Sequence, residues 1–456
     1  MLQCHGSGKA DVDLLQCQME LLGQRTGHPL AHPLHGGHQV KPGLDRSRPG
    51  FETLRVPIVE IKHLLPRWGD AARRLMRRSP EAAPTATPAA VESAPAAPVP
   101  RPAAVPAPAP TAAAPTGLKA VVIDLWGRLD LTLRMASYWR RARAELVAWR
   151  PDAVHAHDAN TLTPASRAAR RLRVPLVYDS HELWTHRNVR ADRPVAKRWE
   201  RLVEKRGIRR ADVVVTVSPS IADWLQSRYR LRRAPLLVRN IPASSPTAGD
   251  RSRGRLRELA SLADDARVLV YCGGVTTNRG IERVVDALAH LDDDHHLVAL
   301  GPASAVVAAE LMRRADETGV ADRVHLVGAV DAHEVTTALA DGDVSFVLTR
   351  PSCLSYRFSL PNKLFESLHA GLPVIANDLP DTGAIVRGAG AGVVVGENAD
   401  ARELAGAVRS ALADRDRLSL AAREAARGLQ WEDDIATLVA AYAEVTVRYR
   451  PGGPRT

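Results

Sequence analysis

The segment at residues 359–376, with the sequence SLPNKLFESLHAGLPVIA, determines how the second half of this chain folds. Residues 362–370 are predicted to form a helix, because Pro361 precedes them and the Gly-Leu-Pro run at 371–373 stops them. Apolar runs at 344–348 and 374–376 flank this helix and are typical of buried parallel strands. Glu366 therefore lies just beyond the carboxyl edge of a parallel sheet, where such sheets bind ligands.

A carboxylate at this edge is suited to a bidentate hydrogen bond with the two hydroxyls of a ribose. Taken alone, Glu366 could also be a residue that merely caps or decorates a helix. A second motif, YCGGVTTNRG at 271–280, bears on this choice. It joins a short apolar strand to a helix through Gly273 and Gly274, which remove side chains where the chain must turn sharply.

Such a strand–turn–helix unit aims backbone N–H groups and the positive end of the helix dipole at one spot, and Arg279 adds a full charge there. The motif predicts an anion site that fits a diphosphate. In isolation it would fit an ordinary strand-to-helix turn with a solvated Arg279 equally well. Together with Glu366 it indicates a nucleotide-sugar site.

Six motifs occur in order between residues 150 and 445: PDAVHAH at 151–157, YDSHE at 178–182, ADVVVTVS at 211–218, RN at 239–240, the glycine loop and the Glu366 helix. In this register they resemble the retaining glycosyltransferases of family 4, also called glycosyl transferases group 1. The resemblance implies the GT-B fold, an α/β architecture in which two Rossmann-like, doubly wound domains face a cleft.

The resemblance also implies roles for individual residues. The second histidine of an HxH segment, here His157, contacts the donor sugar, and the loop at 328–330 supports the nucleobase through backbone groups. Arg279 and Lys363 neutralise the leaving group. The expected catalytic residues are His157, Arg279 and Lys363. The expected donor-binding residues are Gly273, Gly274, Gly328, Val330, Asn362, Glu366 and His181.

Two histidines have roles that need separate comment, and two positions of the expected site differ from the family pattern. His155 falls within a strand and is expected to be a buried structural residue, whereas His181 either bonds to Asp179 or Glu182 or contacts substrate directly. Where the family often has a second glutamate, this chain has Phe358, and Gly274 replaces an arginine that is common beside the glycine loop. The contacts of the donor sugar therefore cannot be copied from better-known members.

The expected domain organisation follows the motifs. Residues 1–50 are a poorly patterned N-terminal segment, either a diverged start of the first domain or a stretch outside the folded domain. Residues 51–240 form the N-terminal, acceptor-side Rossmann-like domain, interrupted by an Ala/Pro-rich linker at 80–117, after which a strand at 120–125 re-enters the sheet. Residues 241–249 are the hinge, 250–429 the C-terminal nucleotide-sugar-binding domain, and 430–446 a helix crossing back to the first domain.

Composition limits the cofactors and partners. The four cysteines form no CxxC or Cys/His cluster, so neither a disulfide framework nor a zinc site is indicated, and we expect no metal and no other cofactor. The net charge is +11, and residues 118–240 hold 26 Lys and Arg against 12 Asp and Glu. This surplus can attract an anionic membrane surface or a phosphorylated substrate, or it can be an arginine-rich surface without a partner. No nucleic-acid-binding motif accompanies it.

No apolar stretch of eighteen residues and no signal-peptide pattern is present, so we expect a cytoplasmic protein, peripheral at the inner membrane face. A basic amphipathic helix expected at 68–78 supports the peripheral contact. The predicted activity is transfer of a hexose-type sugar, with retention, from a nucleotide diphosphate sugar to a hydroxyl of a glycan or lipid-linked acceptor. The alternatives are a nucleotide-sugar epimerase on the same fold and a non-catalytic GT-B-like binding or scaffold protein.

Overall fold

The computed structural model describes residues 19–22, 51–54, 118–187, 194–243, 245 and 248–449. The chain divides into two compact units, one of residues 1–55 and 143–456 and the other of residues 56–142. The expected linker at 80–117, the basic helix at 68–78 and most of the segment at 1–50 lie outside the described residues.

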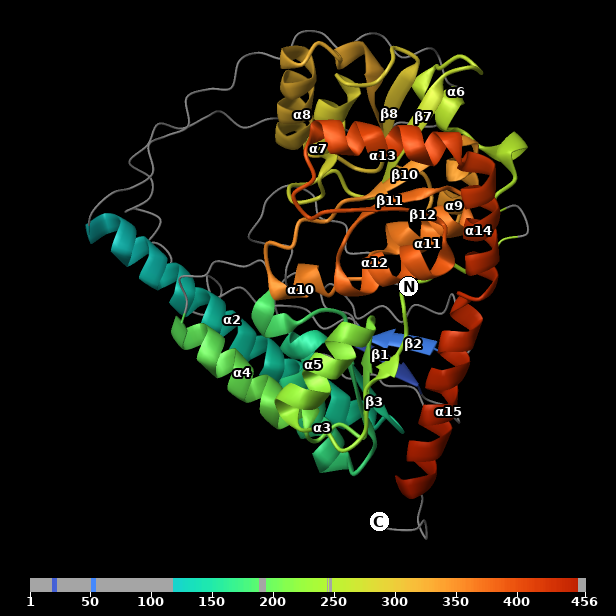
Figure 1. Ribbon diagram of the computed structural model, residues 1–456. Coiled ribbons are helices and arrows are strands. Elements are labelled where there is room, and N and C mark those ends of the chain that lie inside the picture. Colours follow the sequence, from blue (N-terminus) through green and yellow to red (C-terminus); the bar gives the residue numbers. More distant parts are fainter. Residues whose placement is uncertain are drawn as a thin grey trace, which may run out of the picture. The chain divides into compact units, whose positions relative to one another are not determined.

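A six-stranded, wholly parallel sheet organises the second half of the chain, with the strand order β12-β11-β10-β7-β8-β9 (Figure 1). Its strands are β7 (Arg267–Cys272), β8 (His295–Leu300), β9 (Val324–Gly328), β10 (Val344–Val347), β11 (Val374–Asn377) and β12 (Gly392–Val395). They read as short apolar runs because helices cover both faces of the sheet. The predicted doubly wound sheet is confirmed here.

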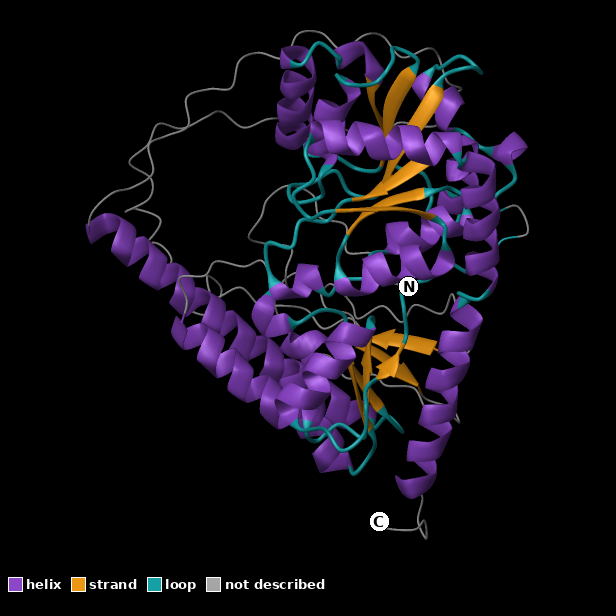
Figure 2. Ribbon diagram, in the orientation of Figure 1, coloured by secondary structure: helices purple, strands orange, loops and turns teal. Residues whose placement is uncertain are grey.

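Helices follow these strands in alternation (Figure 2). They are α6 (Leu256–Ala260), α7 (Ile281–Leu288), α8 (Ala305–Glu317), α9 (Val335–Ala338), α10 (Leu354–Arg357), α11 (Asn362–His369), α12 (Pro380–Ala389), α13 (Ala401–Ala413) and α14 (Arg415–Arg427), with short 3-10 turns at Arg251–Arg253, Ala321–Arg323 and Leu339–Asp341. One apolar core joins α7, α8 and α13 to one face of the sheet. Two others join α11 and α12, and α6 and α9, to the opposite face.

A four-stranded parallel sheet organises the preceding part of the chain, in the order β3-β4-β5-β6. Its strands are β3 (Val154–His157), β4 (Leu176–Ser180), β5 (Val213–Thr216) and β6 (Leu236–Leu237). They alternate with α3 (Asp158–Leu172), a 3-10 turn at Trp184–His186, α4 (Pro194–Ile208) and α5 (Pro219–Tyr229). A separate antiparallel pair consists of β1 (Met19–Leu22) and β2 (Phe51–Leu54).

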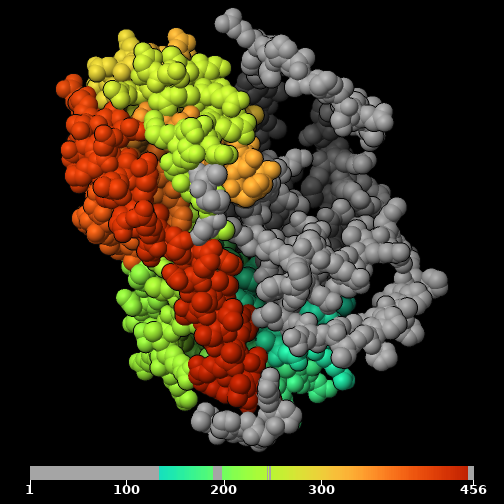
Figure 3. Space-filling model, turned by 90° about the vertical axis from the view of Figure 1, so that its right-hand side faces the viewer, coloured from blue at the N-terminus to red at the C-terminus, as the bar shows by residue number. Residues whose placement is uncertain are grey.

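The last helix, α15 (Trp431–Tyr449), packs against the four-stranded sheet. Figure 3 shows this C-terminal segment in red at the surface, beside green parts of the chain. Leu438 and Val445 are buried against Val177 and Val215 of β4 and β5. At its start, buried Asp434 accepts hydrogen bonds from the guanidinium of Arg239 over distances of 2.6 and 2.9 Å. The C-terminal helix thus contributes apolar surface and a charge-assisted bond to the first sheet.

The prediction of a strand at residues 120–125 is wrong. These residues lie inside the 32-residue helix α2 (Leu118–Trp149). A short apolar run fits a buried strand and a helix segment equally well, and the length of the surrounding element decides between them. No proline interrupts residues 118–149, and good helix formers follow the run, so it continues as one long helix.

No helix within the described ranges combines the length and the apolar character needed to span a membrane.

Candidate functional site

The carboxyl ends of β7 and β10 meet where the order of the second sheet reverses. From β7 the chain runs through β8 to β9 on one side, and from β10 it runs through β11 to β12 on the other. Ligands bind outside the carboxyl ends of parallel strands at such a switch point. The glycine loop follows β7, and α11 with Glu366 follows β10 through α10. The topology therefore brings the two predicted motifs to one place.

The glycine loop owes its path to close backbone contacts. Gly273 has φ 107°, a conformation that side-chain-bearing residues rarely adopt, and its N–H donates to the carbonyl of Leu300 over 2.8 Å. A Cβ on Gly301 would lie 2.1 Å from the carbonyl oxygen of Gly273. The loops after β7 and β8 consequently pack backbone against backbone. A Cβ on Gly274, by contrast, would meet no atom closer than 4.0 Å.

Arg279 stands at the start of α7, beside Gly280, the N-cap of that helix. A Cβ on Gly280 would lie 2.5 Å from the carbonyl oxygen of Leu348, so the start of α7 packs directly on the chain leaving β10. Arg279 is half-buried, its Nε donates to Thr276 over 3.4 Å, and its guanidinium lies 5.5 Å from the ring centre of Tyr356. Its charge adds to the positive end of an eight-residue helix.

Lys363 is buried beside this arginine. Its Nζ donates to the hydroxyl of Tyr271 over 2.9 Å and lies 4.2 Å from the centre of the same ring. Burial, reinforced by the positive charge of Arg279, lowers the pKa of Lys363 to about 7. The Tyr271 hydroxyl in turn donates to the carbonyl of Gly274 over 2.8 Å. Tyr271 thus connects the buried lysine to the glycine loop.

Glu366 lies one helical turn after Lys363 and is half-buried. The thiol of Cys272 donates to its Oε2 over 3.2 Å. Burial raises the pKa of Glu366, while the bond from Cys272 and the charge of Lys363 lower it in part. Burial, together with the Glu366 carboxylate, raises the pKa of the Cys272 thiol well above its usual range, which keeps the thiol protonated as a donor.

Neither Tyr271 nor Cys272 was among the predicted site residues. The signal for both was available, because they are the last two residues of the strand that leads into the glycine loop. Which partners they meet depends on residues 92 and 94 positions away, and the sequence does not show that.

The remaining predicted donor-binding residues of the second sheet lie at the same edge. Gly328 ends β9 with φ 77°, and its carbonyl accepts from the N–H of Gly301 over 2.5 Å. Val330 is half-buried against an apolar cluster of α6 and α9. Asn362 is the exposed first residue of α11. The loops after β7, β8 and β9 are therefore bonded to one another in series.

A histidine cluster occupies the carboxyl edge of the first sheet. His157 ends β3, Asp179 lies near the end of β4, and His181 follows it. Nε2 of His181 lies 3.1 Å from Nδ1 of His157 and 3.2 Å from Oδ2 of Asp179. Asp179, rather than Glu182, is therefore the carboxylate that pairs with His181. His155 is buried behind His157, stacked on its ring at 4.3 Å and bonded to Tyr442 of α15.

Within this cluster, Asp179 is negatively charged and His181 is positively charged. Burial alone would raise the pKa of Asp179, but His181 and its other histidine neighbours hold it well below its usual range. Burial alone would lower the pKa of His181, but the Asp179 carboxylate raises it to about 9, so His181 is protonated at neutral pH. Nδ1 of His157 lies 3.1 Å from Nε2 of His181 and 3.4 Å from Oδ2 of Asp179, so it shares the contact between those two side chains. Nε2 of His157 is buried and has no hydrogen-bond partner among the residues that the structure describes.

Among the residues that the structure describes, two groups of side chains could hold a metal ion on geometry alone. The ligand atoms of His155, His157 and Asp179 all lie within 4.8 Å of one another. A second group, Asp292, Asp294 and His295, lies at the start of β8. In the first group, the proton on His181 already gives Asp179 a charged partner. The expectation that no metal takes part in catalysis stays a proposal.

Two family models match the chain. The model of Glycosyltransferase Family 4 matches residues 96–239, and that of Glycosyl transferases group 1 matches residues 266–414. Together they cover both sheets and place the histidine cluster in one match and the glycine loop and α11 in the other.

The chain belongs to the family 4, group 1 glycosyltransferases.

Curated relatives agree with this assignment. A D-inositol 3-phosphate glycosyltransferase of Xylanimonas cellulosilytica is 29% identical over 310 residues, which is 65% of this chain and 73% of the relative. A glycogen synthase of Mycobacterium tuberculosis is 28% identical over 309 residues, or 67% of this chain and 70% of the relative. The first of these relatives is a glycosyltransferase by its name.

Solved structures show the same fold. The Anabaena protein HepE in complex with UDP matches with a TM-score of 0.54 and 16% identity, covering 66% of this chain and 82% of that one. A sucrose-phosphate synthase of Thermosynechococcus elongatus matches with a TM-score of 0.57 and 20% identity, covering 70% and 79%. The glycosyltransferase therefore has the GT-B fold that the sequence predicted.

Hydrogen bonds join the carboxyl-edge loops of the two sheets in the glycosyltransferase. The hydroxyl of Ser218 donates to the carbonyl of Phe358 over 2.7 Å, and that of Ser220 donates to Asp381 over 2.9 Å. Phe358, which stands where the family often has a glutamate, is thus attached through its backbone to the start of α5. Its side chain carries no charge, so it cannot make the charged contact that a glutamate at this position would make.

Proposed function

We propose that this glycosyltransferase moves a hexose-type sugar from a nucleotide diphosphate sugar to a hydroxyl of a glycan or lipid-linked acceptor, with retention of anomeric configuration. The observation that carries the proposal is the position of Arg279, Lys363 and Glu366 around the glycine loop at the switch point. Two cations and the N-terminus of α7 suit a diphosphate, and the nearby carboxylate suits ribose hydroxyls.

The solved neighbours support a nucleotide-sugar donor. HepE has been solved with UDP and with UDP-glucose bound, and it shares the fold of this chain. UDP is accordingly the first probe to use. The bound sugar would lie at the carboxyl edges of the sheets, near His157, which ends β3.

In the proposed reaction the bond between the anomeric carbon and the diphosphate oxygen breaks, and a bond to the acceptor oxygen forms on the same face of the sugar. Negative charge develops on the departing diphosphate, and Arg279, Lys363 and the N–H groups of the glycine loop stabilise it. The acceptor hydroxyl gives its proton to the leaving phosphate. We propose that no metal is required, because these protein groups supply the positive charge.

Incubation with UDP-, GDP- and ADP-sugars and hydroxyl acceptors tests the proposal. We expect free nucleoside diphosphate and a glycoside whose anomeric configuration, read by NMR, matches that of the donor. Release of an isomeric nucleotide sugar would instead establish an epimerase that uses the histidine cluster as acid and base. Binding of donors without any turnover would establish a non-catalytic protein, and an inverted product would contradict retention.

Protonation of Lys363 gives a second test. In the free protein its pKa is about 7, so the amine is mostly neutral at about pH 8. A bound diphosphate favours the ammonium form and raises this pKa, so UDP binding should take up most of one proton, and affinity should fall as pH rises above 7. Titration calorimetry at about pH 8 in HEPES and in Tris, which differ in ionisation enthalpy, measures the uptake.

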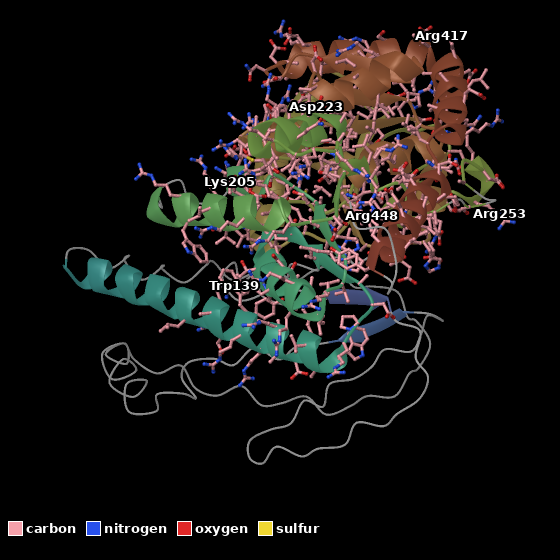
Figure 4. All side chains as sticks on the ribbon, turned by 90° about the horizontal axis from the view of Figure 1, so that it is seen from below. Trp139, Lys205, Asp223, Arg253, Arg417 and Arg448 are labelled. Atoms are coloured by element: carbon pink, nitrogen blue, oxygen red, sulfur yellow. The ribbon has the colours of Figure 1, made fainter. Side chains whose placement is uncertain are left out.

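The Lys363→Met variant should bind UDP without this proton uptake, whereas Lys205→Met, which alters an exposed lysine of α4, should retain it (Figure 4). Heats of binding to the unaltered enzyme that are identical in the two buffers, after correction for dilution, would exclude Lys363 as a partner of the diphosphate.

We also propose that the enzyme works at an anionic membrane surface, on the cytoplasmic side. The support is the surplus of positive charge between residues 118 and 240. A lipid-linked acceptor would be presented at such a surface.

A further inference from the structure

Five arginines line a hollow of about 420 Å³ beside the four-stranded sheet. Arg167, Arg170 and Arg171 come from α3 and stand three and four residues apart, so they share one face of that helix. Arg173 is the C-cap residue of α3, with φ 59°, and Arg143 belongs to the last turns of α2. Side chains from two helices and one helix end therefore converge on the same space.

None of these five guanidinium groups forms a hydrogen bond or an ion pair with any residue that the structure describes, although all five side chains are exposed. Elsewhere in the described chain many arginines have carboxylate partners. Arg314, for example, makes two 2.6 Å bonds to Asp286. Five like charges that share a hollow without a counter-charge create a positive potential that attracts anions.

Two simpler explanations account for only part of this arrangement. The dipole of α3 favours positive charge in its last turn, which explains Arg170 and Arg171. It does not explain Arg167, one turn earlier, or Arg143, which comes from another helix. An arginine-rich surface without a function would place its charges around the helices, whereas here they converge on one hollow.

The hollow is remote from the candidate active site. α3 begins directly after His157 and is 15 residues long, which corresponds to about 22 Å. Arg170, Arg171 and Arg173 lie at the far end of this helix. An anion held there is therefore not the diphosphate that reacts near His157 and Arg279.

We propose that this arginine hollow is a binding site for clustered phosphate groups, of the kind that a phospholipid headgroup or a free oligophosphate presents. The planar guanidinium fork binds phosphate oxygens in pairs, and several forks in one hollow favour a group that carries more than one negative charge. The proposal does not depend on the chemistry at the glycine loop, and loss of the hollow should leave sugar transfer to a soluble acceptor intact.

Titration calorimetry with tripolyphosphate tests the site. We compare the unaltered protein with Arg167→Ala/Arg171→Ala and with the matched control Lys205→Ala/Arg402→Ala, which removes two exposed charges outside the hollow. Affinity should fall at least tenfold in the first variant and less than twofold in the control. A second variant, Arg143→Gln/Arg173→Gln, should show the same loss of affinity. It removes two other arginines of the hollow, so the proposal can still be tested if the first variant misfolds.

Sedimentation with vesicles identifies the source of the phosphate. If the hollow binds lipid headgroups, pelleting with phosphatidylglycerol vesicles should decrease in both hollow variants and stay unchanged in the control, and neutral phosphatidylcholine vesicles should pellet none of the proteins. If vesicle binding is unaffected while tripolyphosphate binding is lost, the site takes free oligophosphates. If tripolyphosphate bound at the glycine loop instead, the hollow variants would still bind it. Equal affinity in all the proteins would therefore overturn the proposal.

Discussion

Replacing Arg279 by alanine should lower the turnover of the glycosyltransferase about a hundredfold or more at saturating donor. The guanidinium lies at the N-terminus of α7 beside the glycine loop, and its charge helps to lower the pKa of the buried Lys363. Negative charge grows on the diphosphate only as the bond to the sugar breaks, so a fixed cation stabilises the transition state more than the bound donor. The Michaelis constant for the donor should therefore change less than turnover does.

The matched control is Arg267→Ala. Arg267 lies at the opposite, amino end of β7, and its side chain forms, among the described residues, only a long, exposed ion pair with Asp294 at 3.9 Å. Its loss should leave turnover within about twofold of the unaltered enzyme, since exposed pairs contribute little. Turnover of Arg279→Ala equal to that of this control would remove Arg279 from the mechanism.

Replacing Glu366 by alanine should weaken the binding of both UDP and UDP-sugars. A carboxylate that accepts hydrogen bonds from ribose hydroxyls contributes roughly 1.5–3 kcal/mol for each bond, which corresponds to about a tenfold to a hundredfold loss of affinity. The half-buried position of Glu366 beside Cys272 limits competition from water. Titration calorimetry of each variant with UDP measures the loss.

Comparison with 2′-deoxy-UDP makes the test specific to the ribose. The unaltered enzyme should bind UDP more tightly than its 2′-deoxy form, and Glu366→Ala should bind the two about equally, because the group that distinguishes them is gone. Glu424→Ala removes an exposed glutamate of α14 and should retain the preference for UDP. Undiminished affinity of Glu366→Ala for UDP would show that Glu366 is only a helix residue.

Local sequence rules were sufficient for the strands around the glycine loop and α11, although they did not predict the edge strand β12. Pro361 and the Gly371 stop mark the bounds of α11 within one residue, and each strand of this sheet is a short apolar run between turn residues. The glycine loop was readable for the same reason, because Gly273 and Gly280 occupy backbone conformations that few other residues tolerate. These features depend on a few neighbouring residues, which a single sequence displays.

The same rules failed where a local pattern had two solutions. The apolar residues at 120–125 fit a strand or a helix, and the long helix α2 that includes them became apparent only in the structure. His181 likewise had two open partners, and the position of β4 beside β3 placed it against Asp179 and His157.

By itself, the sequence determined the alternation of strands and helices around the glycine loop and α11, and the positions of Arg279, Lys363 and Glu366 along the chain. Only the tertiary structure decided the charge states and partners of these groups. The pKa of Lys363 depends on its burial against Tyr271 near Arg279, and that of Glu366 on its burial near Cys272. Desolvation and contacts between residues some ninety positions apart exist only once the sheet has formed. These two effects set the pKa values of the side chains at the site, and a local motif alone does not.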